Sequence, residues 1–488
     1  MATLSKKPSK SRQKRNTISG TEIARYDFVL MGVVAILVGL GLVMIFSASF
    51  EEANRTWGKS TWYFLRQLQW LAVGGVAMVI LALIDYRILH HFALLIMIVT
   101  LGVLIAVLLF GVDNLGARRH LIGTSVQPSE VAKLTITIYI AYWLSSKGDR
   151  IKKVSLGLLP FAILLGLVSL LIILQPDLGT TMVIVVTGLI MYFVAGADGK
   201  QVIATIVIAT ITMVLAVTQI GYAQNRVDEF LAAIKNPGGE GGYQVSAALE
   251  AFARGRWFGT GLGDGAKDVP LPFTDSIFAV VGEELGLVGT LLVVGLFMAL
   301  AYRGLRIALR SQDRFGMVLG CGITGWLAIQ AFFNMAVNTA TLPFSGLTLP
   351  FISYGGSSLL ACLAGVGLLL SISRYGTLAE TSKKPARRDD SQTDAVNASA
   401  GIGRWDWWPR LSNFGRSGRP KKRAKGTARS RRAGATTSYV VKAASFGRAG
   451  KLGGRVTRTK RTIARRTGTS KRKRAANARA VKRIPRRR

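Results

Sequence analysis

The sequence predicts an all-α polytopic membrane protein with about ten transmembrane helices. Half of its 488 residues are hydrophobic, and the mean hydropathy of +0.35 is too high for a soluble chain of this length. Apolar runs of about 18 residues or more recur along the first 375 residues, and each can cross a hydrocarbon core of about 30 Å. Such runs must be helical in lipid, because every backbone polar group needs a partner within its own segment.

The predicted spans follow directly from these runs. In chain order they are 27–48, 66–85, 91–111, 129–146, 155–174, 178–196, 200–220, 276–302, 316–338 and 355–374. The runs 129–146 and 178–196 are the shortest or most polar of the set. The first run is too long for a cleavable signal and has no small-residue cleavage site, so we expect it to remain as a helix.

The distribution of basic residues predicts the topology. A basic segment, Lys6 to Arg15, precedes the first run and points to a cytoplasmic N-terminus. The even-numbered loops are also basic, as the positive-inside rule requires, and ten spans then place both termini in the cytoplasm. The seventh loop, about 221–275, becomes a large extracytoplasmic loop between helices 7 and 8. It is too long for a simple connection, which indicates a functional element.

Charge divides the chain into three regions: a basic cytoplasmic N-terminal segment (1–26), a transmembrane domain (27–376) and a strongly basic cytoplasmic tail (377–488). The tail holds 34 of the 63 Lys and Arg residues but only 5 of the 25 acids, so it carries about +29 of the net +38. It has few large apolar residues and is predicted to be disordered. We expect it to attract anionic lipid at the membrane surface, with nucleic acid as the rival partner.

Asp275 lies where the polar seventh loop meets the eighth apolar run. A carboxylate at such a seam is half desolvated and can still meet a polar substrate. This position suits a general base whose pKa is raised toward neutrality. The alternative is a helix N-cap, in which the carboxylate accepts hydrogen bonds from the first N–H groups of the helix. The two roles are compatible.

Further polar residues lie at the same predicted ends of other spans. Glu130 and Lys133 are three residues apart on one helix and can pair, or act as a cap and a snorkelling side chain. Asp177 is typical of a helix start, and Arg118 and Arg119 suit either a phosphate clamp or an interfacial anchor. The predicted collar consists of Arg118, Arg119, Glu130, Lys133, Gln175, Asp177, Asp275, Ser357 and Ser358. Its nearly balanced charge suits an amphiphile with an anionic headgroup and a lipid tail.

Other kinds of site have weak support. The two cysteines, Cys321 and Cys362, lie inside apolar runs and are expected to be packing residues. The three histidines lack the Cys or carboxylate spacing of a zinc site, so no metal ligands are predicted. The Gly-rich segment 259–265 follows no strand, so it does not predict a nucleotide-binding loop.

Five motifs, in this order, resemble the SEDS (shape, elongation, division and sporulation) family of bacterial glycosyltransferases, the FtsW and RodA type. The resemblance covers about 27–376. The motifs are Gly116-Ala117-Arg118-Arg119, Gln127-Pro128-Ser129-Glu130 with Lys133, Gln175-Pro176-Asp177-Leu178-Gly179-Thr180, Thr274-Asp275 with Glu283-Glu284-Leu285-Gly286, and Pro350-Phe351-Ile352-Ser353-Tyr354-Gly355-Gly356-Ser357-Ser358. Leu271-Pro272-Phe273 departs from the family pattern, which carries an acid and a His before the aspartate.

The resemblance implies a peptidoglycan glycosyltransferase that polymerises lipid II into glycan strands at the outer face of the cytoplasmic membrane. Asp275 matches the family's essential aspartate and would be the general base. Glu130 and Lys133 match its helix-four pair, and the rest of the collar would bind or support the substrate. Arg118, Arg119 or Lys133 would offset the charge of the leaving diphosphate. No resident cofactor is implied, and a divalent cation (Mg²⁺ or Mn²⁺) would be an additional counter-ion.

The resemblance also implies a setting. The expected partners are lipid II, a class B penicillin-binding transpeptidase and other division proteins. Phe64-Leu65-Arg66-Gln67 with Trp70, and Gly282 to Gly286, favour the FtsW-like division type, located at the septum, over a RodA-like elongation polymerase. Two alternatives belong to other classes. One is a flippase for lipid-linked precursors, which lipid II crossing without polymerisation would reveal. The other is a division scaffold, which would tolerate Asp275→Asn.

Overall fold

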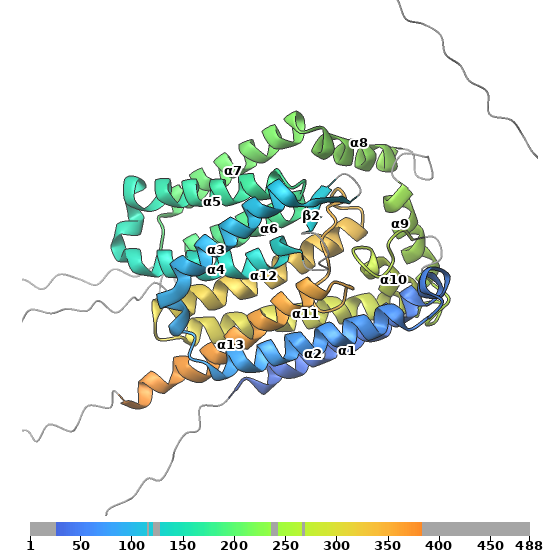
Figure 1. Cartoon of the computed structure of the whole chain (residues 1–488), viewed down its shortest axis with the longest axis horizontal. Helices are drawn as coiled ribbons and strands as arrows, with labels where there is room; N and C mark the ends of the chain where they lie inside the picture. Colours follow the sequence, from blue (N-terminus) through green and yellow to red (C-terminus); the bar gives the residue numbers. More distant parts are fainter. Residues whose placement is uncertain (1–25, 115–116, 121–126, 236–242, 266–268, 383–488) are drawn as a thin grey trace, which may run out of the picture. The chain divides into compact units, whose positions relative to one another are not determined.

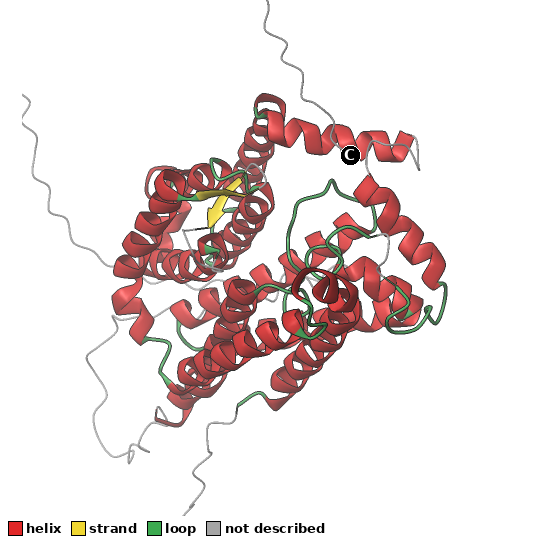
Figure 2. Cartoon of the chain, turned by 45° about the vertical axis from the view of Figure 1, so that its right-hand side comes forward, coloured by secondary structure: helices red, strands yellow, loops and turns green. Residues whose placement is uncertain are grey.

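The chain folds into a bundle of long helices, shown in the computed structural model of Figure 1. The structure describes residues 26–114, 117–120, 127–235, 243–265 and 269–382, and for 112–114, 117–120 and 377–382 it describes the backbone alone. The predicted segments 1–26 and 377–488 therefore fall outside the described residues, apart from Tyr26 and the end of the last helix. Figure 2 shows that two short strands accompany the helices.

The elements follow the apolar runs in order. The helices are α1 (Phe28–Trp57), α2 (Trp62–Leu83), α3 (Ile88–Phe110), α4 (Pro128–Lys147), α5 (Leu159–Ile173), α6 (Leu178–Val194), α7 (Gly199–Gln219), α8 (Gly221–Lys235), α9 (Tyr243–Gly255), α10 (Ile277–Glu284), α11 (Gly286–Arg310), α12 (Arg314–Asn338) and α13 (Gly356–Ser382). The strands β1 (Val112–Asn114) and β2 (Ala117–His120) pair antiparallel between α3 and α4. Short 3-10 and π-helical turns, Gly148–Lys152 and Val154–Leu158, join α4 to α5.

Helices occupy all ten predicted spans, and eight helical segments among the described residues are long and apolar enough to cross a membrane. The two remaining predicted spans are α4, which carries charges, and α6, which has only 17 residues. Both pack among other helices: α4 contacts α3, α6, α12 and α13, and α6 contacts α4, α5 and α12. Because protein rather than lipid covers much of their surface, they need not be as apolar as the outer helices.

The centre of the bundle is formed by α12 and α13, whose most apolar windows are 72% and 83% buried. The outer helices α2 and α7 are only 11% buried over the same length, so their exposed faces are apolar. Exposed apolar faces of this size are what lipid would cover. Figure 1 shows α1 and α2 running side by side with α13, in agreement with the contacts of α2 with both.

The predicted single helix 276–302 is wrong, because the structure divides it into α10 and α11. Gly286 adopts φ 66°, which ends one helix and starts the next in a new direction. The preceding Gly-rich segment supplies partners for the exposed backbone: the Thr260 N–H donates to the Glu283 carbonyl at 2.9 Å, and the Leu287 N–H donates to the Arg256 carbonyl at 2.9 Å. The segment from Arg256 to Gly261 thus stabilises the break between α10 and α11, and we call this segment the Gly-rich clasp.

The seventh loop is also more ordered than its composition indicates. It contains α8 and α9 before it reaches Asp275. One face of α9 packs against α10, where Ala248, Ala251 and Ala279 share a small buried cluster. The loop therefore packs against α10, the helix that follows Asp275.

Candidate active site

Asp275 lies in the turn that leads into α10 and is only 8% exposed. The predicted N-cap role is wrong, because Ser276 and not Asp275 occupies the N-cap position of α10, and Ser276 makes no side-chain cap bond. The Asp275 Oδ1 instead accepts a hydrogen bond from Thr274 Oγ1 at 3.1 Å. The difference arises because the helix starts one residue later than the apolar pattern suggests, which leaves the Asp275 carboxylate outside the first turn.

The surroundings of Asp275 favour its neutral form more than water does. Burial raises the pKa of the Asp275 carboxyl, while the Thr274 hydrogen bond and the attraction of Arg226 act in the opposite direction. Arg226 belongs to α8, and its guanidinium lies 4.8 Å from the centre of the Phe344 ring. Sequence reasoning missed this cation because nothing in the long loop indicated which residues would face the aspartate.

Two amides of α12 hold the backbone at Asp275. Asn334 Nδ2 donates to the Asp275 carbonyl at 2.8 Å, and Asn338 Nδ2 donates to the same oxygen at 2.9 Å. Asn334 also donates to the Leu347 carbonyl at 2.7 Å. Both amides are buried. The signal for them was present in the sequence: Gln330, Asn334 and Asn338 recur every four residues in an otherwise apolar run, which places them on one face of the helix.

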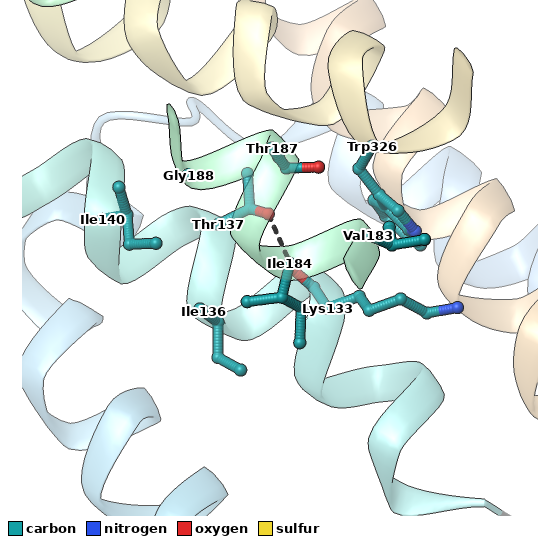
Figure 3. A pocket seen from close by; sticks show the side chains of 9 residues that line it. All are labelled: Lys133, Ile136, Thr137, Ile140, Val183, Ile184, Thr187, Gly188 and Trp326. Atoms are coloured by element: carbon teal, nitrogen blue, oxygen red, sulfur yellow. Dashed lines mark hydrogen bonds between the residues drawn. The ribbon is translucent and has the colours of Figure 1, made fainter. Parts of the chain in front are cut away.

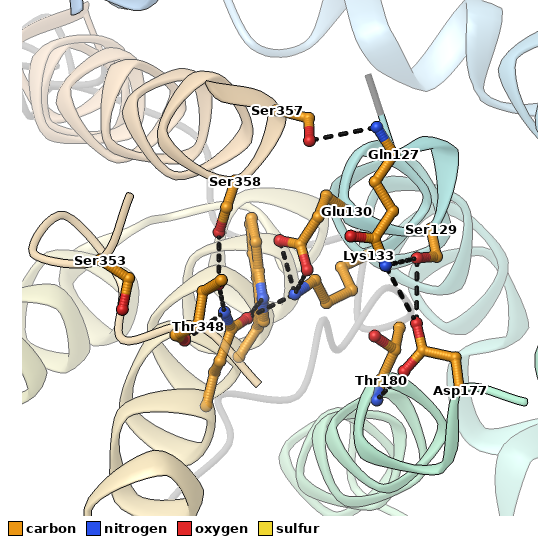
Figure 4. A network of polar contacts seen from close by, with 12 residues as sticks. Gln127, Ser129, Glu130, Lys133, Asp177, Thr180, Thr348, Ser353, Ser357 and Ser358 are labelled. Atoms are coloured by element: carbon orange, nitrogen blue, oxygen red, sulfur yellow. Dashed lines mark hydrogen bonds and ion pairs between the residues drawn. The ribbon is translucent and has the colours of Figure 1, made fainter. Parts of the chain in front are cut away.

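Lys133 is the centre of a buried polar network, shown in Figure 4. Its Nζ lies 2.8 Å from both carboxylate oxygens of Glu130 and 2.6 Å from Gln330 Oε1. The Lys133 side chain is 1% exposed, so the snorkelling alternative is wrong and the predicted Glu130–Lys133 pair is confirmed as a contact. Two of the three donors of the ammonium group are used in hydrogen bonds, one to Glu130 Oε1 and one to Gln330 Oε1, while Glu130 Oε2 lies within ion-pair distance only.

Asp177 combines a cap with a tertiary contact. Its Oδ1 accepts from the Thr180 N–H at 3.1 Å, which confirms the predicted helix start at α6. Its Oδ2 accepts from Ser129 Oγ at 3.1 Å and from Gln127 Nε2 at 3.3 Å. Asp177 therefore ties the start of α6 to the start of α4.

The start of α13 and the segment before it contribute the remaining polar contacts of the predicted collar. Ser357 Oγ accepts from the Gln127 N–H at 3.2 Å, and Ser358 Oγ lies 2.9 Å from Thr348 Oγ1. The Tyr354 N–H donates to the Phe273 carbonyl at 2.8 Å, two residues before Asp275. Four of the five motif segments thus meet at one end of the bundle, through contacts that no single motif predicts.

Two other collar predictions have different outcomes. Gln175 is buried but donates to the Leu104 carbonyl of α3 at 2.9 Å, so it fastens helices and does not join the network around Lys133. Arg118 and Arg119 lie in β2, whose backbone contacts α3 and α4. Their side chains lie outside the described residues, so their predicted role at a phosphate stays a prediction.

Two hollows border this region. The first, shown in Figure 3, lies beside the Lys133 stem and has a volume of only about 10 Å³, too small for a substrate. The second is an open groove of about 1310 Å³ between α1 and the segment that leads to Asp275, with Phe273 in its lining. Of these two spaces, only the second is large enough for a sugar substrate.

The described residues offer few ligands to a divalent cation. The described residues contain no group of three or more His, Cys, Asp or Glu side chains that could hold an ion. Mg²⁺ commonly binds one or two carboxylates together with substrate phosphates. Asp275 is a single such carboxylate, so the residues fit at most a shared ion and give no dedicated metal centre.

Comparisons with known proteins agree on one family. A family model for FtsW, RodA and SpoVE, described as cell cycle proteins, matches residues 28–378. The chain is 38% identical over 372 residues to the "Probable peptidoglycan glycosyltransferase FtsW" of Trichlorobacter lovleyi, covering 75% of this chain and 97% of the relative. It is 37% identical over 356 residues to "Stage V sporulation protein E" of Bacillus subtilis, covering 72% of this chain and 97% of the relative.

Solved structures show the same fold. A chain of a peptidoglycan synthase complex, described as coordinating polymerization and crosslinking, aligns with a TM-score of 0.60 at 28% identity, covering 72% of this chain and 99% of that chain. The rod shape determining protein RodA of Thermus thermophilus aligns with a TM-score of 0.53 at 27% identity, covering 72% of this chain and 98% of that chain.

Proposed function

The chain belongs to the FtsW/RodA/SpoVE family, and we propose from this premise that it is a peptidoglycan glycosyltransferase in which Asp275 is the general base. It polymerises lipid II into glycan strands. The observation that carries the assignment of the base is the burial of the Asp275 carboxylate, which has a raised pKa, in a segment that α12 and the segment before α13 hold by hydrogen bonds. A carboxylate with a raised pKa has a stronger affinity for a proton than an exposed aspartate, which suits a general base.

The reaction needs one proton acceptor. The Asp275 carboxylate takes the proton from the 4-hydroxyl of the acceptor N-acetylglucosamine, and that oxygen forms a bond to C1 of the donor N-acetylmuramic acid. The bond from C1 to the diphosphate oxygen breaks with inversion, and undecaprenyl diphosphate leaves with the electron pair. Because the diphosphate is already a stable anion, it needs little protonation, and a single carboxylate is sufficient.

The basic residues divide into two roles. Lys133 has two of its donors committed to Glu130 and Gln330, so we assign this pair to positioning α4 against α12. Arg226 attracts the Asp275 carboxylate and is only partly buried. Arg226 is therefore our candidate for the cation that receives the departing diphosphate, together with Arg118 and Arg119. A divalent cation, if used, would be carried by the diphosphate oxygens, and no step depends on it.

The setting of the reaction is proposed from the relatives. Similarity to proteins named FtsW favours a role in cell division over RodA-like elongation. A neighbour within a complex for polymerization and crosslinking supports a crosslinking partner of the penicillin-binding class. We propose that the Asp275 end of the bundle faces the outside of the cytoplasmic membrane, where lipid II and that partner would meet it, and that the protein acts at the septum.

The test is polymerisation of labelled lipid II by the purified full chain in proteoliposomes. Asp275→Asn keeps the shape of the side chain but removes the base, so we expect glycan synthesis to fall at least about 100-fold, the lower range for a lost general base. Lipid II binding should persist. The matched control is Asp149→Asn, at an exposed aspartate in the turn after α4, which should polymerise like the wild type.

The same experiment separates the alternatives. Full activity of Asp275→Asn would reject Asp275 as the base. Lipid II that crosses the bilayer without being polymerised by the wild type would favour a flippase. A wild type that neither polymerises nor moves lipid II, with division intact in cells that carry Asp275→Asn, would favour a scaffold.

A further inference from the structure

One face of α1 forms a wall of the open groove near Asp275. The lining residues Val43, Phe46, Ser47, Phe50, Glu51 and Asn54 recur every three or four positions, so they share one side of the helix. The deeper part of this wall is apolar and aromatic, and the part toward the end of α1 is polar. The proposed reaction does not use any of these residues.

The opposite wall is the segment that leads to the base. It includes Leu262, Gly263 and the run Pro270–Phe273. Ser47 fixes the two walls together, because its Oγ donates to the Glu284 carboxylate at 2.7 Å and accepts from the Gly263 N–H at 2.7 Å. The width of the groove is therefore set by hydrogen bonds between α1, the Gly-rich segment 259–265 and the end of α10.

The lining of the groove reaches Phe273, two residues before Asp275 in the chain. Tyr63 and Phe273 both line it, and their ring centres are 4.6 Å apart. Phe273 is two residues before Asp275 and accepts, through its carbonyl, the Tyr354 N–H of the segment before α13. A chain of sugars held in the groove would thus lead toward the carboxylate from the α1 side.

The volume favours an extended ligand. At about 1310 Å³ the groove exceeds the usual range of about 300–1,000 Å³ for pockets that hold one small molecule. A single disaccharide would not fill it, whereas several linked sugars would.

The lining chemistry favours sugar over lipid phosphate. Glu51 is exposed and makes no hydrogen bond or ion pair among the described residues, and Arg55 is engaged by Glu52 at 2.8 Å. The polar end is therefore net acidic and would repel a diphosphate. Carboxylate and amide groups such as Glu51 and Asn54 accept hydrogen bonds from hydroxyls. The Phe46 and Phe50 rings offer broad apolar area for the C–H faces of sugars.

We propose that this groove is a saccharide site that holds the glycan strand next to the bond being formed. The inference rests on the proposed glycosyltransferase function and adds to it a function in retaining the strand between additions. An enzyme that holds its product in this way adds many units before release, so loss of contacts in the groove shortens the strands.

The first test measures strand length. Glu51→Gln and Phe50→Ala are assayed with labelled lipid II, and products are resolved by length. We expect mean strand length to fall at least threefold and to fall by a larger factor than the rate of first bond formation. The matched controls are Glu229→Gln on α8 and Ile36→Ala on α1, both exposed and outside the groove, and their strands should match the wild type. Unchanged length in Glu51→Gln and Phe50→Ala overturns the proposal.

The second test measures binding without catalysis. The probe is an N-acetylglucosamine tetramer, added to full-chain protein carrying Asp275→Asn, and binding is followed by thermal shift. We expect binding that Glu51→Gln weakens at least fivefold. If the tetramer does not bind, or binds equally to both variants, the saccharide site is rejected even when the wild type polymerises. If the wild type does not polymerise, the proposed function fails by itself. Competition by a polyprenyl diphosphate alone would assign the groove to the lipid instead. Should Phe50→Ala fail to fold, Glu51→Gln decides.

Discussion

The carboxylate of Asp275 is active as a base only when it is ionised, so its pKa sets the acid limb of the pH–rate profile. Burial raises that pKa, and the Thr274 hydrogen bond lowers it again. We therefore expect the acid limb above the range of an exposed aspartate, whose pKa is about 3.9. Thr274→Val removes a bond that favours the ionised form, so the limb should move to higher pH.

The measurement is the initial rate of lipid II polymerisation against pH for both proteins. Activity of Thr274→Val should be lower than wild type on the acid side and approach it as pH rises through the shifted pKa. Thr218→Val on α7, an exposed threonine outside the site, is the control. An acid limb at the same pH in wild type and Thr274→Val would show that another group controls the profile.

Asn338 acts on the reaction through the backbone of Asp275. Asn338→Leu leaves the carbonyl with one donor, Asn334, in place of two. Loss of a buried hydrogen bond costs about 0.5–1.5 kcal/mol, and displacement of a reacting group by about 1 Å can cost about 100-fold in rate. We expect kcat for lipid II polymerisation to fall between about 10- and 100-fold with a small change in KM.

The KM-against-kcat comparison separates this role from a structural one. Phe332→Leu, at an exposed position of the same helix, should retain both constants. If Asn338→Leu loses stability and activity in parallel, or loses only substrate affinity, the assignment of Asn338 as a positioning residue is wrong.

At the level of single residues, the hydropathy pattern identified the charged residues of the site but not the two amides that hold the Asp275 backbone. Asp275, Glu130 and Lys133 stand out because a charge inside or beside an apolar run is costly. Asn334 and Asn338 disturb the apolar pattern too little to end a predicted span, although their spacing marks one face. Arg226 could not be assigned at all, because its relation to Asp275 depends on how α8 folds back over a loop of more than 50 residues.

The helix break at Gly286 illustrates what the pattern of an element cannot show. Glycine within an apolar run is tolerated by a continuous helix, so the sequence alone favours one long span. The break is stabilised by donors and acceptors from Arg256 to Gly261, some 25 residues earlier. Only the tertiary structure brings this segment to Gly286, and the break allows α10 to bury all eight of its residues beside Asp275.

Gly286→Ala tests the break directly. An alanine would have to keep φ 66° and place its Cβ against the backbone of Trp257 and Gly259. Strain of this kind costs about 1–3 kcal/mol, so the melting temperature in detergent should fall. The control is Gly39→Ala within α1, where a Cβ meets nothing within 4 Å. Equal melting temperatures for the two variants would contradict the proposal that the Gly-rich clasp packs closely against Gly286 at the helix break.

Across the whole molecule, hydropathy placed helices at all ten predicted spans but missed α8, α9 and the division into α10 and α11, and it did not predict which helices are central. The polar α4 and the short α6 are both covered by other helices. The most buried helices, α12 and α13, have mean hydropathies of 1.5 and 1.8, within the range of 1.5 to 2.2 spanned by the exposed α2 and α7. Lipid and protein interior are both apolar, so composition does not distinguish the centre of a bundle from its surface.

The basic tail is the part of the chain to which no catalytic contact is assigned, and its charge supports a prediction about the whole protein. Polybasic segments beside a membrane gain about 1 kcal/mol per charge near an anionic surface, and residues 377–488 carry about +29.

We compare the full chain with a chain truncated after residue 390, measuring recruitment of added vesicles with and without anionic lipid. Truncation should abolish recruitment of anionic vesicles and leave polymerisation of lipid II unchanged, and added salt should weaken recruitment by the full chain. Equal recruitment of neutral and anionic vesicles would contradict the lipid assignment. Release of anionic vesicles by a small amount of nucleic acid would instead favour a nucleic-acid partner, whose phosphates a basic segment neutralises in the same way.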